Sequence, residues 1–226
     1  MDIDALKRKA GVAAAAEVRD GMVVGLGTGS TVRFTIEELG RRVRDEGLRI
    51  RGIPTSLASE KLAREVGIPL TTLDAEPVVD LTIDGADELD PQLRLIKGGG
   101  GALTREKVVA KASKRMVVVA DAGKSVPTLG TTFALPIEVL EFAKAPVQRA
   151  VAELGAIVTL RSKDGAAVRT DNGNVILDAK FPSIKDPETL ERTLELMPGV
   201  VCCGLFLGLC QAAYVAGRGG VTKMGA

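Results

Sequence analysis

The feature that most constrains the fold is a regular alternation of short apolar runs with amphipathic stretches over the first 121 residues. Buried strands are predicted for the apolar runs at residues 22–27, 48–53, 78–83 and 116–120. Helices are predicted between them, at residues 30–43, 56–67 and 103–112. Repeated β-α-β units of this kind indicate an α/β fold, with a mostly parallel sheet that is covered by helices on both faces.

The order of the predicted elements changes after about Asp121. Strand, helix, strand, strand, helix and strand follow each other at residues 133–140, 145–155, 156–161, 175–181, 186–197 and 199–206. This β-α-β-β-α-β order is ferredoxin-like. Because residues 212–217 are expected to return to the first sheet as a strand, the expected domains are 1–130 with 208–226, and a smaller α+β domain at 131–207.

Composition excludes several classes of function. Thirty basic and 29 acidic residues give a net charge of +1, so no overall field favours nucleic acid or an anionic membrane. The chain has no histidine, which excludes catalytic triads built on histidine and histidine-ligated metal sites. A general base must therefore be a carboxylate, a lysine, a cysteine or the single tyrosine, Tyr214.

The apolar segments indicate a soluble, cytoplasmic protein with no membrane partner. The apolar stretch at residues 12–16 is too short for the core of a signal peptide. The longest apolar run, residues 200–210, is shorter than the roughly 20 residues that span a bilayer. Its cysteines, Cys202, Cys203 and Cys210, are expected to be reduced and buried.

The sequence "GLGTGST" at residues 25–31 follows a predicted strand and opens a predicted helix. Open α/β sheets bind ligands at this position, and the N–H groups at a helix N-terminus suit a phosphate. The dinucleotide fingerprint fails because Ser30 occupies the place of its third glycine. The glycine spacing also matches the loop of S-adenosylmethionine-dependent methyltransferases, and a plain tight turn is a third interpretation.

Two further segments carry polar residues just after predicted strands. Asp84 and Asp87, in "TIDGADE", are close enough to divide acid and base duties, although aspartates in turns often only cap the backbone. Lys124, in "AGKS", is at a position where ligands gather, and an anion-binding lysine and a solvated surface lysine are both consistent with it.

Four consecutive glycines, Gly98 to Gly101, stand between Lys97 and the predicted helix that contains Glu106. A flexible linker is one interpretation, but the run is short and lies inside a β-α unit. Successive glycine N–H groups can also form a concave anion-binding site. A lysine beside it can stabilise a negative oxygen, and a nearby carboxylate can move a proton.

Taken in order, "GLGTGST", "TIDGADE", "IKGGGGALTREK", "VADAGKS" and "TDNGNVILD" resemble the type A family of ribose-5-phosphate isomerases over nearly the whole chain. The resemblance implies a Rossmann-like catalytic domain with a small ferredoxin-like lid domain. It also implies a metal-independent interconversion of ribose 5-phosphate and ribulose 5-phosphate through an enediolate, in the pentose phosphate pathway. No cofactor is implied, and a homodimer or homotetramer is expected.

The resemblance also implies roles for particular residues of the motifs. Glu106 corresponds to the base that moves a proton between C1 and C2, and Lys97 to the group that stabilises the enediolate. Asp84 and Asp87 correspond to residues that assist ring opening and hold sugar hydroxyls. The remaining substrate-binding positions implied are Thr28, Gly29, Ser30, Thr31, Gly85, Ala86, Gly98, Gly99, Gly100 and Lys124. A non-catalytic sensor of sugar phosphates remains the alternative outside the enzymes.

Overall fold

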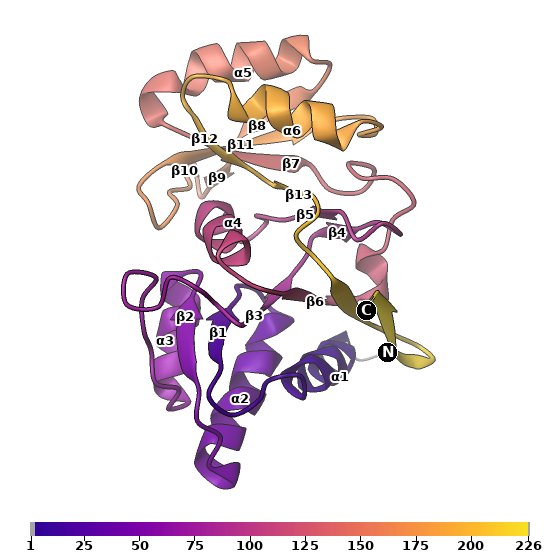
Figure 1. Cartoon of the computed structure of the whole chain (residues 1–226). Coiled ribbons are helices and arrows are strands. Elements are labelled where there is room, and N and C mark those ends of the chain that lie inside the picture. The colour runs from indigo at the N-terminus through magenta and orange to yellow at the C-terminus, as the bar shows by residue number, and fades with distance from the viewer. Residues whose placement is uncertain (1–2, 226) are drawn as a thin grey trace. The chain divides into compact units, whose positions relative to one another are not determined.

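The computed structural model describes residues 3–225, and the chain divides into two units (Figure 1). Unit 1 consists of Met1–Ala86, Arg105–Lys124 and Gly208–Ala226, and unit 2 of Asp87–Thr104 and Ser125–Leu207. The sequence-based boundaries differ from this division, because residues 87–104 and 125–130 belong to unit 2.

Unit 1 contains a six-stranded sheet in the order β15-β14-β6-β3-β1-β2. The strands, in that order, are Gly220–Gly225, Ala212–Gly217, Met116–Asp121, Leu81–Gly85, Val23–Leu26 and Arg51–Pro54. All neighbouring pairs are parallel except β14 with β15, which is antiparallel. The prediction of a mostly parallel sheet is therefore confirmed, as is the return of residues 212–217 to it.

Helices cover both faces of this sheet, as the alternation predicted. On one face lie α1 (Ile3–Ala15), α2 (Val32–Glu46) and α3 (Leu57–Glu65), which share a core with inward residues of the strands such as Leu26 and Ile83. On the other face, Val109 of α4 (Leu103–Lys111) packs with Val23 of β1 and Ile53 of β2. Since neighbouring residues of a strand point to opposite faces, the short strands supply both cores.

Unit 2 contains a four-stranded antiparallel sheet in the order β12-β7-β11-β8. These strands are Val200–Cys203, Leu135–Val139, Val175–Lys180 and Ile157–Leu160, and the helices are α5 (Lys144–Glu153) and α6 (Pro187–Glu195). The chain order β7-α5-β8-β11-α6-β12 confirms the ferredoxin-like prediction. Helix α6 is capped, because the side chain of Asp186 accepts a hydrogen bond from the N–H of Thr189 at 3.0 Å.

Short elements were not predicted. The pair β9 (Ser162–Lys163) and β10 (Ala166–Ala167) forms a hairpin, and β4 (Glu88–Leu89), β5 (Leu95–Ile96) and β13 (Leu205–Phe206) form a three-stranded sheet. Two short 3-10 helices, η1 (Ala122–Lys124) and η2 (Glu141–Ala143), follow β6 and β7.

The single strand predicted at residues 199–206 divides at Gly204 into β12 and β13, which belong to different sheets. Gly204 has no room for a side chain, since a Cβ would overlap the carbonyl oxygen of Lys97 and the ring of Pro136. Most of the apolar run, including Cys203 and Phe206, is buried, and the three cysteines are buried and outside any disulfide, as predicted. Among residues 3–225, no helix has the length and apolar character needed to cross a bilayer.

A partly buried ionic cluster connects the end of α1 to the sheet of unit 1. Glu17, just after α1, accepts hydrogen bonds from Arg115, from Tyr214 at 2.5 Å and from Lys223 at 3.1 Å. The Arg115 guanidinium, assisted by the other two donors and opposed by burial, lowers the pKa of Glu17 to about 2. Burial, together with the hydrogen bond to Glu17, raises the pKa of Tyr214 to about 12. Glu17 is therefore a carboxylate at neutral pH and Tyr214 a neutral phenol.

We expect Glu17→Gln to lower the free energy of unfolding at pH 7 by on the order of 2–3 kcal/mol. Because folding lowers the pKa of Glu17 from 4.5 to about 2, this stabilisation is complete above pH 4.5 and is lost as the pH falls towards 2. Urea denaturation from pH 7 to pH 2.5 measures it. Glu37→Gln is the control, since Glu37 forms only surface ion pairs with Arg8 and Arg33. A difference between the two variants that does not shrink in acid would contradict the assignment.

Candidate active site

The polar loops of unit 1 gather at one edge of its sheet. Because β1, β3 and β6 are parallel neighbours, the segments that follow them, residues 27–31, 84–86 and 122–124, lie at the same, carboxyl, edge. These segments contain Thr28 to Thr31, Asp84 to Ala86 and Lys124, which are site residues predicted from the sequence. The sheet thus brings the predicted residues of unit 1 to one place.

Asp84 is the centre of this edge. It is fully buried, and its Oδ1 accepts hydrogen bonds from the N–H groups of Thr28 at 3.0 Å and of Gly85 at 2.7 Å. A Cβ on Gly27 would overlap the carboxylate and the Cα of Asp84, so only glycine allows the β1 loop to approach this closely. The aspartate therefore fixes the loop of residues 27–31 against the end of β3.

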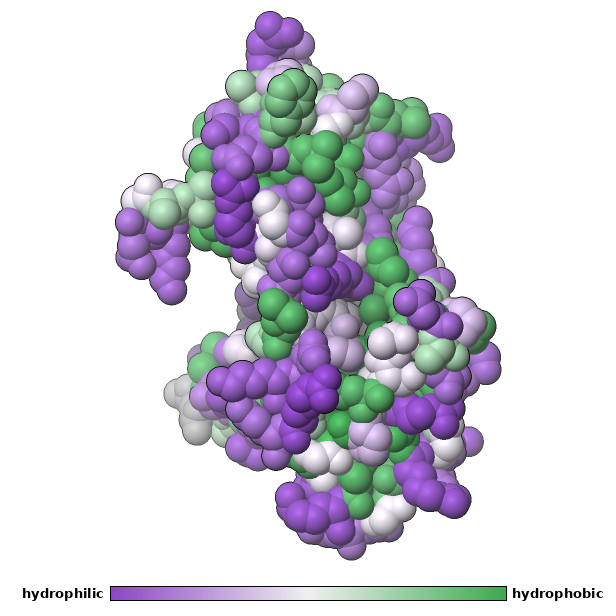
Figure 2. Space-filling model, turned by 90° about the vertical axis from the view of Figure 1, so that its left-hand side faces the viewer, coloured by the Kyte–Doolittle hydropathy of each residue, from purple (hydrophilic) through white to green (hydrophobic). Residues whose placement is uncertain are grey.

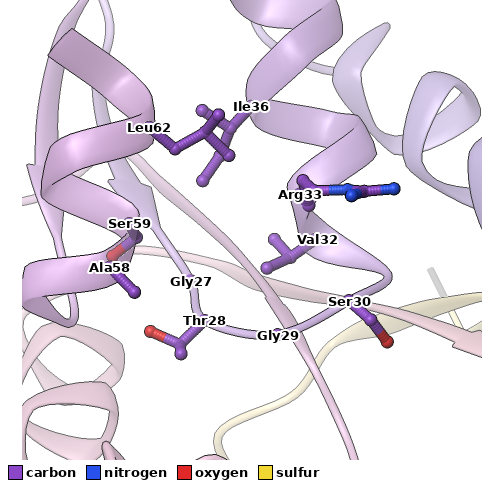
Figure 3. A pocket seen from close by; sticks show the side chains of 10 residues that line it. All are labelled: Gly27, Thr28, Gly29, Ser30, Val32, Arg33, Ile36, Ala58, Ser59 and Leu62. Carbon is purple, nitrogen blue, oxygen red and sulfur yellow. The ribbon is translucent and has the colours of Figure 1, made fainter. Parts of the chain in front are cut away.

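The loop of residues 27–31 borders a cavity of about 370 Å³ (Figure 3). Ile36 and Leu62 lie side by side on its apolar side, and the side chain of Ser30 points away from them. The hydroxyl of Thr28 forms hydrogen bonds with the hydroxyls of Thr55 at 2.8 Å and Ser56 at 2.7 Å. The side chain of Thr28 is thus held towards the next strand-to-helix turn.

Helix α4 brings Glu106 towards the same edge. Val109 contacts the face of the sheet at Gly25, where a Cβ would meet its methyl group, and Ser113 shares a hydrogen bond of 2.6 Å with Thr82. Residues three apart lie on one side of a helix, so Glu106 faces the sheet together with Val109, one turn nearer the start of α4. Only 3% of its surface is exposed.

Lys124 ends η1, directly after β6, and is partly buried. The turn before it is held by Asp121, whose Oδ1 accepts a hydrogen bond from the N–H of Gly123 at 3.0 Å. The lysine is therefore attached to a short, braced turn at the carboxyl edge, as the anion-binding interpretation requires.

The other predicted residues, Asp87, Lys97 and the glycines, belong to unit 2. The glycine run is a tight turn and not a linker: the N–H of Gly101 donates to the carbonyl of Gly98 at 3.0 Å, and both residues have positive φ angles, 81° and 101°. The N–H of Gly99 donates to Oδ2 of Asp87 at 2.7 Å, and a Cβ on Gly99 would collide with that carboxylate. Asp87 thus braces the turn.

Lys97 is a buried cation, only 2% exposed. Its Nζ lies 5.4 Å from the centre of the Phe206 ring, a distance at which the ring face attracts a cation. Its N–H donates to the carbonyl of Gly204 at 2.8 Å. The close approach of Gly204 therefore positions the lysine, and the apolar residues around Cys203 and Phe206 form its surroundings.

The chain is similar to known proteins over most of its length. The family model described as ribose 5-phosphate isomerase A (phosphoriboisomerase A) matches residues 51–220. The chain belongs to this family. Relatives of that name from Methanosarcina acetivorans and Nitrobacter hamburgensis are 53% and 52% identical, over 96% and 98% of this chain and 93% and 97% of theirs. The methyltransferase interpretation of residues 25–31 is therefore wrong.

Solved structures of isomerases of the family share the whole fold. The enzyme from Methanocaldococcus jannaschii has a TM-score of 0.94 and 43% identity, and covers 98% of this chain and 99% of its own. A D-ribose-5-phosphate isomerase in complex with phospho-erythronic acid has a TM-score of 0.97 and 38% identity over the full length of both chains. The isomerase fold, with its two units, is therefore that of this chain.

One cation at the carboxyl edge, Lys7, lies outside the sequence motifs of the isomerase family. Lys7 of α1 donates a hydrogen bond of 2.9 Å from its Nζ to the hydroxyl of Ser30. A Cβ on Gly11 would touch Phe34 and Thr35, so α1 and α2 approach closely there and bring Lys7, one turn away, to the start of α2. This contact depends on the packing of two helices, and no local pattern around Lys7 could have indicated it.

One group within residues 3–225 has ligand atoms close enough to hold a cation. Carboxylate oxygens of Glu191 and Glu195 in α6 and the Sγ of Cys203 in β12 lie within 4.8 Å of one another. Carboxylates at positions i and i+4 are common on helices that bind no ion. This group alone supports no metal site, and none of its members is a predicted site residue of the isomerase.

Proposed function

We propose that the protein interconverts D-ribose 5-phosphate and D-ribulose 5-phosphate in the pentose phosphate pathway, in the cytoplasm. The observation that carries the proposal is the fold shared over the full chain with an isomerase solved in complex with phospho-erythronic acid. That compound combines a phosphate with a planar carboxylate, whose shape and charge are similar to those of an enediolate. A site that accepts it suits an aldose–ketose isomerisation through such an intermediate.

We propose Glu106 as the base of the reaction. Its carboxylate removes the proton from C2 of the open-chain aldose, and the electrons of the C–H bond form the C1–C2 double bond as the carbonyl oxygen becomes negative. The hydroxyl proton on O2 passes to the negative O1, a carbonyl forms at C2, and the same carboxyl group returns its proton to C1, so that no hydrogen is gained or lost. The burial of Glu106 and its place near the start of a helix that packs on a face of the sheet of unit 1 support this role.

Lys97 supplies the positive charge that the enediolate oxygen needs. A buried ammonium group stabilises a negative oxygen far better than an exposed one, because little water competes with it. We assign ring opening and the binding of sugar hydroxyls to Asp84 and Asp87, which are held by backbone N–H groups. The other binding positions are those of the family motifs: Thr28, Gly29, Ser30, Thr31, Gly85, Ala86, Gly98, Gly99, Gly100 and Lys124.

Glu106→Gln should abolish most of the turnover while the fold and substrate binding persist. The amide keeps the shape of the side chain but cannot accept the proton, so kcat should fall by about 10²–10⁴-fold. A coupled spectrophotometric assay of ribulose 5-phosphate formation measures kcat, and circular dichroism checks the fold. Glu60→Gln is the control, because Glu60 pairs only with Arg64 on the surface of α3. Near-normal turnover by folded Glu106→Gln would remove Glu106 as the base.

We add Lys7 to Lys124 as a cation for the substrate phosphate. Lys7 contacts the hydroxyl of Ser30, at the start of α2, where backbone N–H groups also favour an anion. Two lysines on separate elements suit the double negative charge of a phosphate ester.

Lys7→Met should raise the KM for ribose 5-phosphate about tenfold or more and change kcat little, since a phosphate anchor binds ground state and transition state alike. Lys9→Met, on the exposed side of α1, is the control with the same change of charge. Steady-state kinetics with ribose 5-phosphate and with unphosphorylated ribose separate the effects. An equal loss for both substrates would show that Lys7 does not act through the phosphate.

We propose that the protein is a homodimer or homotetramer. In unit 2, Phe142 is 99% exposed and Leu196 is 77% exposed. Their segments are joined, because the N–H of Leu140 donates to the carbonyl of Gly199 at 2.9 Å. Figure 2 shows hydrophobic residues interspersed with hydrophilic ones on the face that it draws. A fully exposed phenylalanine with exposed apolar neighbours suits an interface with a second copy.

Phe142→Asp should therefore shift the protein towards smaller species in sedimentation-velocity experiments. An aspartate at the interface would have to lose its water without gaining a partner. Leu57→Asp, at an exposed apolar residue of unit 1, is the control. A wild-type protein that sediments as a monomer at micromolar concentration would overturn the proposal directly.

A further inference from the structure

We propose that Arg161, held by Asp178, is a positioning residue that orients the peptide groups of the glycine turn at residues 98–101. Asp178 ends the motif at residues 170–178, but no role has been assigned to it or to Arg161. The inference deepens the proposed function, on which it rests, because it says how the turn presents a hydrogen-bond donor to the sugar.

Hydrogen bonds hold both the guanidinium and the backbone of Arg161. Its Nε donates to Oδ2 of Asp178 at 2.9 Å and its Nη2 to Oδ1 at 2.5 Å, which is a two-pronged ion pair. The backbone N–H of Arg161 donates to the carbonyl of Ile176 at 2.8 Å. The side chain of Arg161 is only 15% exposed. The planar group therefore has little freedom to turn.

The remaining nitrogen, Nη1, binds the glycine turn. It donates to the carbonyl oxygens of Gly98 at 2.8 Å and of Gly99 at 3.0 Å. Glycine has few steric preferences of its own, so a run of glycines can adopt many backbone conformations. Two hydrogen bonds from a fixed cation select one of them.

The planar trans peptide converts this contact into a direction for each N–H group. In a trans peptide the N–H points opposite to the C=O, and residues 3–225 contain no cis peptide bond. With the carbonyl of Gly98 on Arg161, the N–H of Gly99 points the other way, where Oδ2 of Asp87 accepts it at 2.7 Å. The first peptide group thus lies between a guanidinium and a carboxylate.

The second peptide group, between Gly99 and Gly100, has the same orientation, but no carboxylate accepts its N–H in the described part of the chain. With the carbonyl of Gly99 on Arg161, the N–H of Gly100 also points away from the guanidinium. Gly100 is exposed, and its N–H has no hydrogen-bond acceptor among residues 3–225. Arg161 therefore holds one polarised donor ready for a ligand. A cation on the carbonyl strengthens the N–H as a donor, since charge-assisted and linked hydrogen bonds reinforce each other.

The ligand group that suits this donor is a sugar oxygen that becomes negative in the reaction. An N–H fixed before the reaction stabilises such an oxygen more in the transition state than in the ground state. Loss of Arg161 should therefore affect kcat more than KM. Arg161 acts through the turn and is not itself required to touch the substrate.

The test compares Arg161→Met with Arg169→Met. Arg169 is a matched control, because it also pairs with a carboxylate, that of Glu141, and donates to a glycine carbonyl, that of Gly173 at 3.3 Å. Arg161→Met should lower kcat/KM for ribose 5-phosphate by about 10- to 100-fold, mainly through kcat, whereas Arg169→Met should change it less than about twofold. Arg161→Lys keeps the charge but not the two-pronged pair and should restore only part of the loss.

Hydrogen exchange of the substrate-free protein, read by nuclear magnetic resonance, gives a result that does not depend on activity. The N–H of Gly99 should exchange faster in Arg161→Met than in wild type and be unchanged in Arg169→Met. Asp178→Asn provides a second variant that keeps the arginine, and it should give the same change in smaller degree. If wild type does not turn over ribose 5-phosphate, the proposed function fails while the exchange rates still test the orientation of the turn. Unchanged Gly99 exchange in folded Arg161→Met, or unchanged kcat in an active enzyme, would overturn the inference.

Discussion

The buried carboxylate of Asp84 is the constraint on which the carboxyl edge of unit 1 depends. Burying a charge costs several kcal/mol unless hydrogen bonds replace the lost water, and the N–H groups of Thr28 and Gly85 supply two of them. These bonds pull the β1 loop against β3, and Gly27 is needed because any side chain would occupy the same space. The loop of residues 27–31 and Asp84 are therefore one mechanical unit, and a change to either moves the other.

Unit 2 uses the same device to hold its irregular segments. The fully buried Glu88 accepts hydrogen bonds from the N–H groups of Gly130, Thr132 and Phe133 at 2.5–2.7 Å. Glu138, also fully buried, accepts from the hydroxyls of Thr104 and Thr170 and from the amides of Asn172 and Asn174. Thr104 stands two residues before Glu106 in α4, so the turn at residues 170–174 is linked through Glu138 to the start of the helix that bears the proposed base.

Hydrophobic periodicity predicted the elements that have one clearly apolar and one clearly polar face. It failed where the two faces differ little, or where the element pairs with a segment far away in the sequence. The pattern of helix α2 is easy to recognise because Val32, Ile36 and Leu39 recur at helical spacing. The pattern of α1 is weaker because this helix buries mainly small residues such as Ala10 and Ala14. Strands β4 and β5 are two residues long: β4 pairs with β5, and β5 pairs with β13 at Leu205–Phe206, far along the chain. For the same reason residues 87–104 belong to unit 2, which no local pattern revealed. At the candidate site, motifs indicated the residues of the loops, but Lys7 and Arg161 are placed by tertiary packing alone.

The hydrogen-bond partners of the carboxylates between residues 84 and 106 suit these groups to different roles. Glu88 and Asp90 each hold several backbone N–H groups, and either would have to release a turn in order to accept a proton. Asp84 and Asp87 brace the β1 loop and the glycine turn, which suits groups that bind hydroxyls in a fixed place. Glu106 is attached differently, because it projects from α4, whose backbone is held by its own hydrogen bonds. A base that serves two neighbouring carbon atoms must move its carboxylate without releasing a turn, and attachment to a regular helix suits the proposed role of Glu106.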